Sequence, residues 1–302
     1  MAPEWNFERV TEAYPGVSGG LAWDGSAVLF TLPEADRIVR HDPRTGQTAD
    51  FRKYTNRTHG LAFSPRGELY GCQQLSRRIV RFNADGTTTP MTYKFSDGGY
   101  HNMPYDLAID RMNRVWFSDP MHRLPARGPA RPYPNHQSVL RLEQLPDRTW
   151  ILKRMTSDTG RPNGILVSAD QKTLYLADSD DDKAELRAYP IDAEGELGNY
   201  AVLHTWGKDR RGRHRGVDGM CLDADGNIVA CAGSSRTGPG PMVYVFTPTG
   251  RILETHPTPV GPVNCTFGDA DLTTLYMTSV GGGLYRVRGS GRKGWLIWPA
   301  AA

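Results

Sequence analysis

Short apolar runs recur along the whole chain, and turns rich in Gly, Pro, Asp and Asn separate them. At 61–63 the run LAF precedes the turn SPRGE and a second apolar run at 69–72. Apolar runs bounded by turn residues are typical of β-strands, and two of them joined by a tight turn predict a hairpin. Apolar positions at helical spacing are almost absent, so the pattern predicts an all-β fold.

The same hairpin is present six times. Each copy opens with a polar or small residue, usually followed by Gly, and successive copies begin 40 to 58 residues apart. The opening residues are Gly19, His59, Tyr105, Asn163, Asp218 and Asn264. Repeats near this period are typical of propeller blades. Most copies continue into an alternating third strand, so we predict one six-bladed β-propeller domain, 1–302, with four-stranded blades around a central channel.

The ends of the repeat and two long interruptions complete the predicted architecture. After the strand at 284–288 little chain is left for the sixth blade, so we predict that the strand-like stretch 7–10 supplies its outer strand. The segments 121–137 and 206–217 predict long loops, which are often functional in compact domains. Cationic residues in or beside them could meet an acidic substrate, although solvent exposure is the favoured interpretation: Arg123, Arg131, His136 and Arg215.

Composition narrows the class of protein. The net charge of +3 is too small to indicate nucleic-acid binding. The start lacks an apolar stretch of signal-peptide length, and no apolar run is long enough to span a membrane, so we expect a cytoplasmic protein without a membrane partner. Four cysteines lie in strand-like segments without metal-type spacing, and we predict that they are reduced core residues: Cys72, Cys221, Cys231 and Cys265.

The opening residues of the hairpins are the candidates for function. Inner strands of a propeller run along its axis, so these residues should meet at one rim of the channel. Five of the six are polar, and Asp and Asn oxygens suit Ca²⁺ or Mg²⁺, whereas His59 would extend the choice to Zn²⁺ or Mn²⁺. A polar rim filled with water is an equally good interpretation. Asp106 could support the rim beside Tyr105, whereas Asp178 is better interpreted as a turn cap.

Four motifs make the sequence similar to a known family: NMPYD at 102–106, RPNG at 161–164, DGMCLDADG at 218–226 and NCTFG at 264–268. With them the chain resembles the SMP-30/gluconolactonase/LRE family, which includes regucalcin. The resemblance implies a six-bladed propeller, often a metal-dependent lactonase that opens sugar lactones, with one divalent cation in the channel. It also implies that Asn163, in the PNG motif, and Asp218, in the DGM motif, are metal ligands.

The sequence departs from the family pattern at three rim positions. Gly19 stands where the family has a metal-binding Glu, Tyr105 where it has the Asn of a PND motif, and His59 where it often has Asn. Loss of one of two carboxylates removes a charge worth several kcal/mol at an effective dielectric constant of ~20. Metal affinity should therefore fall. His59 could replace the lost ligand, or His59 and Tyr105 could transfer protons without a metal.

The preferred hypothesis is a lactonase-like hydrolase that acts on a small lactone or ester in the channel with metal assistance. Ca²⁺ is the first choice of metal; Mg²⁺, Zn²⁺, Mn²⁺ or no metal are alternatives. Asn163 and Asp218 would bind the metal, and the catalytic candidates are Asp218, His59 and Tyr105. The substrate-binding candidates are Asp106, Asn264, His101 and Arg215.

Two other functions stay open on the same scaffold. One is a metal-independent isomerase, cyclase or lyase in which His59 and Tyr105 form the acid–base pair. The other is a non-catalytic protein that binds a small molecule, because a propeller fold does not by itself determine an activity.

Overall fold

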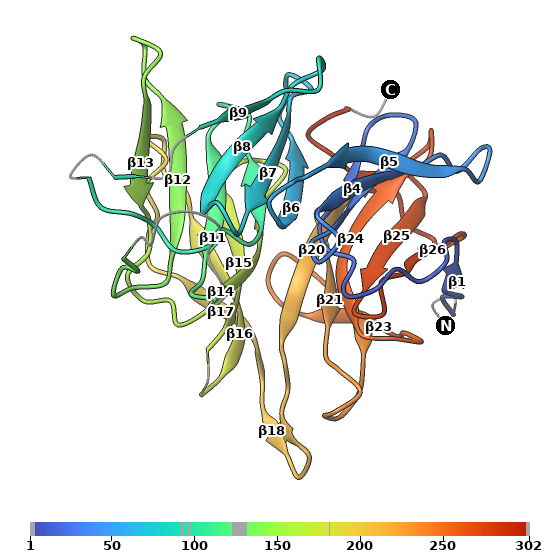
Figure 1. Cartoon of the computed structure of the whole chain (residues 1–302). Coiled ribbons are helices and arrows are strands. Elements are labelled where there is room, and N and C mark those ends of the chain that lie inside the picture. The colour runs from blue at the N-terminus through green and yellow to red at the C-terminus, as the bar shows by residue number, and fades with distance from the viewer. Residues whose placement is uncertain (1–3, 92–93, 96–97, 123–131, 181, 300–302) are drawn as a thin grey trace.

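The computed structural model describes residues 4–91, 94–95, 98–122, 132–180 and 182–299, and within these ranges the chain contains strands and turns but no helix. Six small antiparallel sheets surround a common axis (Figure 1). The predicted all-β, six-bladed propeller is therefore confirmed. Arg123 and Arg131, two of the predicted loop cations, lie outside the described residues.

The first three blades each contain four strands in chain order, beginning with the innermost strand. They are β2 Leu21–Trp23, β3 Val28–Leu32, β4 Arg37–His41 and β5 Thr48–Lys53; β6 Thr58–Phe63, β7 Leu69–Gln73, β8 Arg78–Phe82 and β9 Thr88–Pro90; and β10 Leu107–Ile109, β11 Val115–Asp119, β12 Ser138–Gln144 and β13 Trp150–Arg154.

The last three blades repeat this order, with additions at both ends of the chain. Their strands are β14 Pro162–Val167, β15 Thr173–Ser179, β16 Ala184–Pro190 and β17 Ala201–Trp206; β20 Val217–Asp223, β21 Ile228–Ala232, β22 Met242–Phe246 and β23 Ile252–Pro257; and β24 Pro262–Gly268, β25 Thr274–Ser279, β26 Leu284–Val287 and β1 Glu8–Arg9.

Burial follows position within each blade. The second strand β3 is buried along its whole length, whereas the outer strand β5 is largely exposed. The apolar clusters lie between neighbouring blades, where side chains of one sheet pack on those of the next. The four cysteines are free and buried, as the sequence predicted for core residues. In the described part of the chain, no helix is long and apolar enough to cross a membrane.

The N-terminal stretch completes the sixth blade. β1 pairs with β26 through Glu8 opposite Arg286 and Arg9 opposite Tyr285, and the two strands lie side by side in Figure 1. Trp5 fixes this end further, since its ring stacks on His256 at 3.9 Å and its indole N–H donates to the carbonyl of Ser290. The predicted closure of the ring by the N-terminus is therefore confirmed.

The C-terminal stretch closes one end of the channel, which the sequence did not indicate. β27, Gly294–Trp295, pairs with the end of the inner strand β20, so this blade has five strands and the prediction of four was wrong for it. The chain then continues across the channel, and the Trp298 ring packs on Phe63 with centroids 4.5 Å apart. The open mouth therefore lies at the opposite end.

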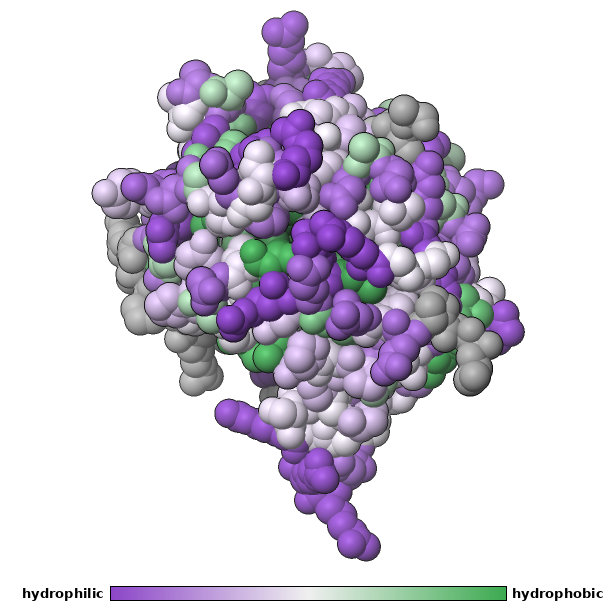
Figure 2. All heavy atoms as spheres, turned by 90° about the vertical axis from the view of Figure 1, so that its right-hand side faces the viewer, coloured by the Kyte–Doolittle hydropathy of each residue, from purple (hydrophilic) through white to green (hydrophobic). Residues whose placement is uncertain are grey.

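The second predicted loop contains a small hairpin. β18 Lys208–Asp209 pairs with β19 Gly212–Arg213, and the hairpin projects from the ring at the bottom of Figure 1. Asp209 stabilises its tip by accepting backbone N–H bonds from Arg211 and Gly212. The projecting tip is hydrophilic (Figure 2). It places the residues that follow, including Arg215, at the mouth of the channel.

Candidate functional site

A polar cavity of about 400 Å³ lies at the open mouth of the channel. Four of the six predicted rim residues line it: His59, Tyr105, Asn163 and Asp218. The other lining side chains come from strand ends and from the turns between strands. They include Glu34, Arg57, Gln74, His122, Arg161, Arg213 and Arg215.

The recurring pair of a polar residue and Gly has a structural cause. In β6, β14 and β20 the register with the second strand shifts at this pair, so each pair forms a bulge. The glycine then allows close approach to the next blade. A Cβ on Gly164 would lie 2.0 Å from the carbonyl oxygen of Asp218, and one on Gly60 would lie 2.7 Å from that of Tyr105. Adjacent inner strands therefore pack closely, and their opening side chains gather at the mouth.

Asp218 is the centre of the hydrogen-bond network in the mouth. Tyr105 donates its hydroxyl to Oδ1 of Asp218 at 2.9 Å, and Arg215 donates from Nη2 to Oδ2. The same Nη2 donates to the carbonyl of Pro262 at 3.0 Å, which connects the start of β20 with β24. Burial and the Asp218 charge raise the pKa of Tyr105 well above its usual value, so the phenol stays protonated as a donor.

His59 is a neutral base in this site. Its ring stacks on that of Tyr105 with centroids 3.9 Å apart and is almost completely buried. Burial lowers the pKa of His59 to about 4, so the imidazole is uncharged near neutral pH. Its Nδ1 is buried without a hydrogen-bond partner. The ring lies beside Gly19, where an added Cβ would be 3.3 Å from the imidazole and 2.6 Å from Thr31 Oγ1.

Asn163 presents an unused acceptor. Its Nδ2 donates a long bond of 3.4 Å to the carbonyl of Val217, whereas Oδ1 is buried without a partner. A buried acceptor in this state favours any ligand that donates a hydrogen bond or a positive charge to it. In the mouth, a substrate hydroxyl would satisfy that requirement.

Sequence reasoning missed several contributors to the mouth, among them His122 and Glu34. The His122 ring lies 5.3 Å from that of Tyr105, and burial together with the Arg161 charge lowers its pKa, so it is a second neutral imidazole. Glu34 follows β3 and pairs with Arg57 at 2.5 Å. Neither belongs to the repeated motif. The only signal in the sequence was their position directly after the second strand of a blade, at the end that meets the mouth.

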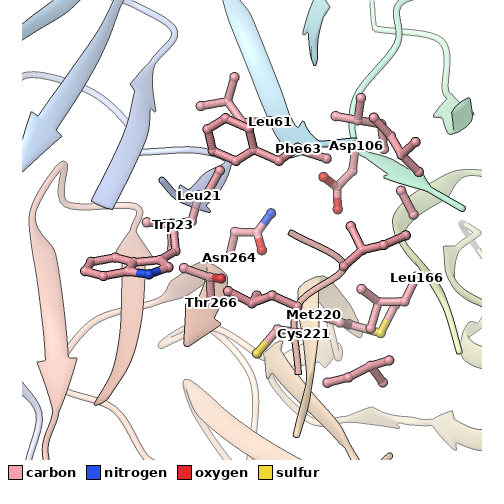
Figure 3. Close-up of a pocket in the computed structure, with 18 of the residues that line it drawn as sticks. Leu21, Trp23, Leu61, Phe63, Asp106, Leu166, Met220, Cys221, Asn264 and Thr266 are labelled. Carbon is pink, nitrogen blue, oxygen red and sulfur yellow. The ribbon is translucent and has the colours of Figure 1, made fainter. Parts of the chain in front are cut away.

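Several predicted residues lie elsewhere. Asp106 and Asn264 face a separate cavity of about 140 Å³ inside the channel, away from the mouth lining (Figure 3). Burial raises the pKa of Asp106 to about 7. His101 is completely buried and bonded to Asp119 at 3.1 Å, so the structure does not bring it to the mouth. Asp178 accepts the backbone N–H groups of Gly160 and Arg161, the capping role favoured for it.

The donor set does not fit a divalent cation. No cluster of three or more His, Cys, Asp or Glu side chains suited to a metal occurs in the described ranges. Of the predicted ligands, only Asp218 carries charge, both its oxygens accept hydrogen bonds, and Arg215 offsets its charge. Hard cations prefer several charged oxygen ligands. The unpaired oxygen of Asn163 alone does not supply them, so the expected pair Asn163 and Asp218 is not prepared for a metal.

Comparison with known proteins agrees with the fold and identifies a family. The family described as SMP-30/Gluconolactonase/LRE-like region matches residues 17–281. A gluconolactonase of Zymomonas mobilis is 26% identical over 283 residues, which is 87% of this chain and 76% of that protein. The matched region contains all the rim residues.

Solved structures give the same result. A gluconolactonase of Xanthomonas campestris superimposes with a TM-score of 0.78 at 27% identity, covering 95% of this chain and 90% of that one. A regucalcin of Agrobacterium tumefaciens, described as a calcium-binding protein, has a TM-score of 0.73 at 15% identity and covers 94% of each chain. At that identity the second comparison supports the fold alone.

Proposed function

The chain belongs to the SMP-30/gluconolactonase/LRE-like family, and from that premise we propose that it is a hydrolase that opens a small lactone in the mouth cavity. Gluconolactonase relatives at modest identity support a lactonase-like hydrolase. The observation that carries the proposal further is the bonded group of Tyr105, Asp218 and Arg215 beside a neutral imidazole. It combines a positioned oxyanion donor with a base in one cavity.

Arg215 supplies the positive charge of the site. Burial alone would lower the pKa of Arg215, but the adjacent Asp218 raises it on balance, so the guanidinium stays charged. We assign it the role of stabilising the oxyanion that forms when water attacks the lactone carbonyl, through N–H groups that Asp218 does not use. The one hydrogen of the Tyr105 hydroxyl is donated to Asp218, so Tyr105 helps to position the carboxylate that orients Arg215. Asp218 holds the guanidinium in position. It acts as a positioning residue, because its two oxygens already accept their hydrogen bonds.

His59 is the proposed general base. Neutral imidazole accepts a proton from the attacking water, and the resulting imidazolium gives that proton to the ring oxygen when the carbon–oxygen bond breaks. The balance is one lactone and one water giving one hydroxy acid. Asn163 would accept a hydroxyl of the substrate through its unpaired Oδ1. His122, also neutral, lies against the Tyr105 ring and contributes to the polar wall.

A metal is not part of this mechanism. Several members of the family bind a cation, as the regucalcin comparison indicates for that protein. In this chain Asp218 is the one carboxylate among the six opening residues, and it is already paired with the Arg215 guanidinium. The Arg215 side chain thus provides, at the same place, the positive charge that polarises a carbonyl.

A lactone panel tests the proposal. Purified protein, dialysed against EDTA, is mixed with aldonolactones of five- and six-membered rings, and acid release is followed by pH-stat above the spontaneous rate. We expect hydrolysis of at least one member, with the hydroxy acid identified by mass spectrometry. Arg215→Met should abolish it, whereas Arg211→Met, at the exposed hairpin tip, should not. A product with the same mass as the substrate would show that the protein isomerises the lactone and does not hydrolyse it, and would overturn the proposal.

A further inference from the structure

Three of the four cysteines lie together beneath the mouth. Cys221 is in β20, Cys231 in the neighbouring β21 and Cys265 in β24 of the next blade, and all three are buried. The sulfur atoms of Cys221 and Cys265 are 3.5 Å apart, and Cys265 Sγ also lies 3.4 Å from the carbonyl oxygen of Val229. The mechanism proposed above uses none of these thiols.

The two closest thiols border an internal space. Cys221 and Cys265 both line the cavity of about 140 Å³ inside the channel, and Figure 3 shows Cys221 beside Met220 at its edge. A cavity of this size is several times larger than the space that one water molecule occupies. A peroxide molecule, two oxygen atoms with their hydrogens, is small enough to enter it.

The cluster favours one thiol as the nucleophile. The S–H groups of Cys221 and Cys231 stabilise a thiolate on Cys265 and lower its pKa, whereas burial raises the pKa of both neighbours. Thiolates, not thiols, react with peroxides. Cys265 is therefore the thiol of the cluster that ionises most readily, and Cys221 lies 3.5 Å from it as the second thiol.

We propose that Cys221 and Cys265 form a reversible disulfide when the protein meets hydrogen peroxide. The Cys265 thiolate attacks one peroxide oxygen, the O–O bond breaks, and the released hydroxide takes up a proton to become water. The Cys221 sulfur then attacks the sulfenic acid on Cys265, forming the S–S bond and releasing a second water. Two thiols are oxidised and one peroxide is reduced to two waters, so electrons and atoms balance.

The disulfide would link the strands that build the mouth. An S–S bond is ~2.05 Å long, so the two sulfurs must approach by roughly 1.5 Å from their present separation. β20 carries Asp218 three residues before Cys221, and β24 receives the Arg215 hydrogen bond at Pro262. Oxidation would thus join blades five and six covalently, directly behind the Asp218–Arg215 pair.

Thiol counting and peptide mapping test the site. The whole folded protein is treated with hydrogen peroxide, its remaining thiols are alkylated in denaturant, and a digest is analysed without reduction. We expect the number of reactive thiols to fall from four to two, with a peptide joining Cys221 to Cys265 that dithiothreitol removes. Loss of two thiols as separate sulfinic or sulfonic acids would overturn the proposal, as would a link that contains Cys231.

Matched variants identify the pair. Cys221→Ala and Cys265→Ala should each abolish the crosslinked peptide, whereas Cys72→Ala, which removes a buried cysteine of β7 in another blade, should leave it at the wild-type amount. If a variant does not fold, the crosslink in the unmodified protein still decides the question. Loss of the Cys221–Cys265 crosslink in a folded Cys72→Ala protein would contradict the assignment.

Discussion

The hydroxyl of Tyr105 donates a hydrogen bond of 2.9 Å to Oδ1 of Asp218 across the mouth of the channel. The two residues are 113 positions apart in the chain and belong to blades three and five. Each opens or precedes an inner strand, so the ring of blades, and not local sequence, brings them together. This bond fixes the Asp218 carboxylate, whose other oxygen accepts from Arg215 and so orients the guanidinium toward the cavity.

Removal of the phenol oxygen should weaken catalysis more than binding. Tyr105→Phe keeps the stacking on His59 but leaves Asp218 Oδ1 without its partner, so the carboxylate that orients Arg215 is held less firmly. We expect kcat to fall by up to ~100-fold with a smaller change in KM, because the oxyanion donor is less precisely placed. The unpaired buried oxygen should also cost about 1–3 kcal/mol of unfolding free energy. Steady-state kinetics and urea unfolding measure the two effects, and a change in KM alone would contradict the assigned role.

Activity should not depend on a divalent metal. Since Arg215 already neutralises Asp218, lactone turnover should be the same in EDTA and in added Ca²⁺, and calorimetry should detect no Ca²⁺ binding in the unmodified protein. Arg215→Met frees the Asp218 carboxylate while removing the oxyanion donor, so this variant should lose activity by ~100-fold or more in either buffer. Loss of wild-type activity in EDTA, restored by Ca²⁺, would show that the cation displaces Arg215 and would refute the metal-free mechanism.

The pH profile should report the buried imidazole. Burial lowers the pKa of His59 to about 4, and the neutral form is the active base. kcat/KM should therefore stay level from pH 7 down to about 5 and fall tenfold per pH unit below about 4. His59→Gln should lower kcat/KM by ~100-fold and remove this limb of the profile. An inflection near 6.5 in the unmodified protein would indicate an exposed base in place of His59.

The sequence predicted the blades and the rim better than the mouth as a whole. The repeated start of the inner strand could be recognised because the polar–Gly pair in three of its copies has a local cause, the bulge and the close approach of the next inner strand, as at Gly60 and Gly164. His59, Tyr105, Asn163 and Asp218 therefore reached their expected place. Asn264 faces the inner cavity because it stands one position later in its bulge. The register shift between Pro262 and Cys265 puts Val263 at the place equivalent to Asn163, and Asn264 at the place equivalent to Gly164.

Residues outside the repeat were harder to place. His122 and Glu34 reach the mouth from turns after second strands, and a turn's conformation is set by tertiary contacts that the sequence does not show. Arg215 was predicted as a substrate-binding residue, but its pairing with Asp218 depends on the chain reversing after β19. This pairing offsets the charge of the Asp218 carboxylate. The metal hypothesis assumed that the carboxylate was free, and the motif around Asp218 could not show that Arg215 pairs with it.

Closure of the ring by the N-terminus should be important for stability. Trp5 is buried, stacks on His256 and bonds to Ser290, and β1 supplies the outer strand of blade six. Trp5→Ala should cost ~3–5 kcal/mol of unfolding free energy, and deletion of 1–14 should lower Tm further. Differential scanning calorimetry measures both. The exposed Glu12, substituted by Ala, is the control, and an unchanged Tm after the deletion would contradict a structural role for β1.

The buried carboxyl in the channel should make stability depend on pH in a predictable direction. Burial raises the pKa of Asp106 from 3.8 to about 7. A raised folded-state pKa favours the protonated group, so the stabilising effect is complete below pH 3.8 and is lost as the pH rises through about 7. At ~1.4 kcal/mol per pKa unit, the loss is on the order of 4 kcal/mol.

The substitution Asp106→Asn tests this effect. Its side chain is always neutral and still offers an oxygen to the backbone N–H groups that bond to the carboxyl. The variant should be more stable than the unmodified protein at pH 8 and nearly equal to it at pH 4. Urea unfolding at the two pH values measures the difference, with Asp225→Asn in an exposed turn as the control. An equal effect of Asp106→Asn at both pH values would mean that the carboxyl is ionised inside the channel at pH 4 as well, with a cationic partner.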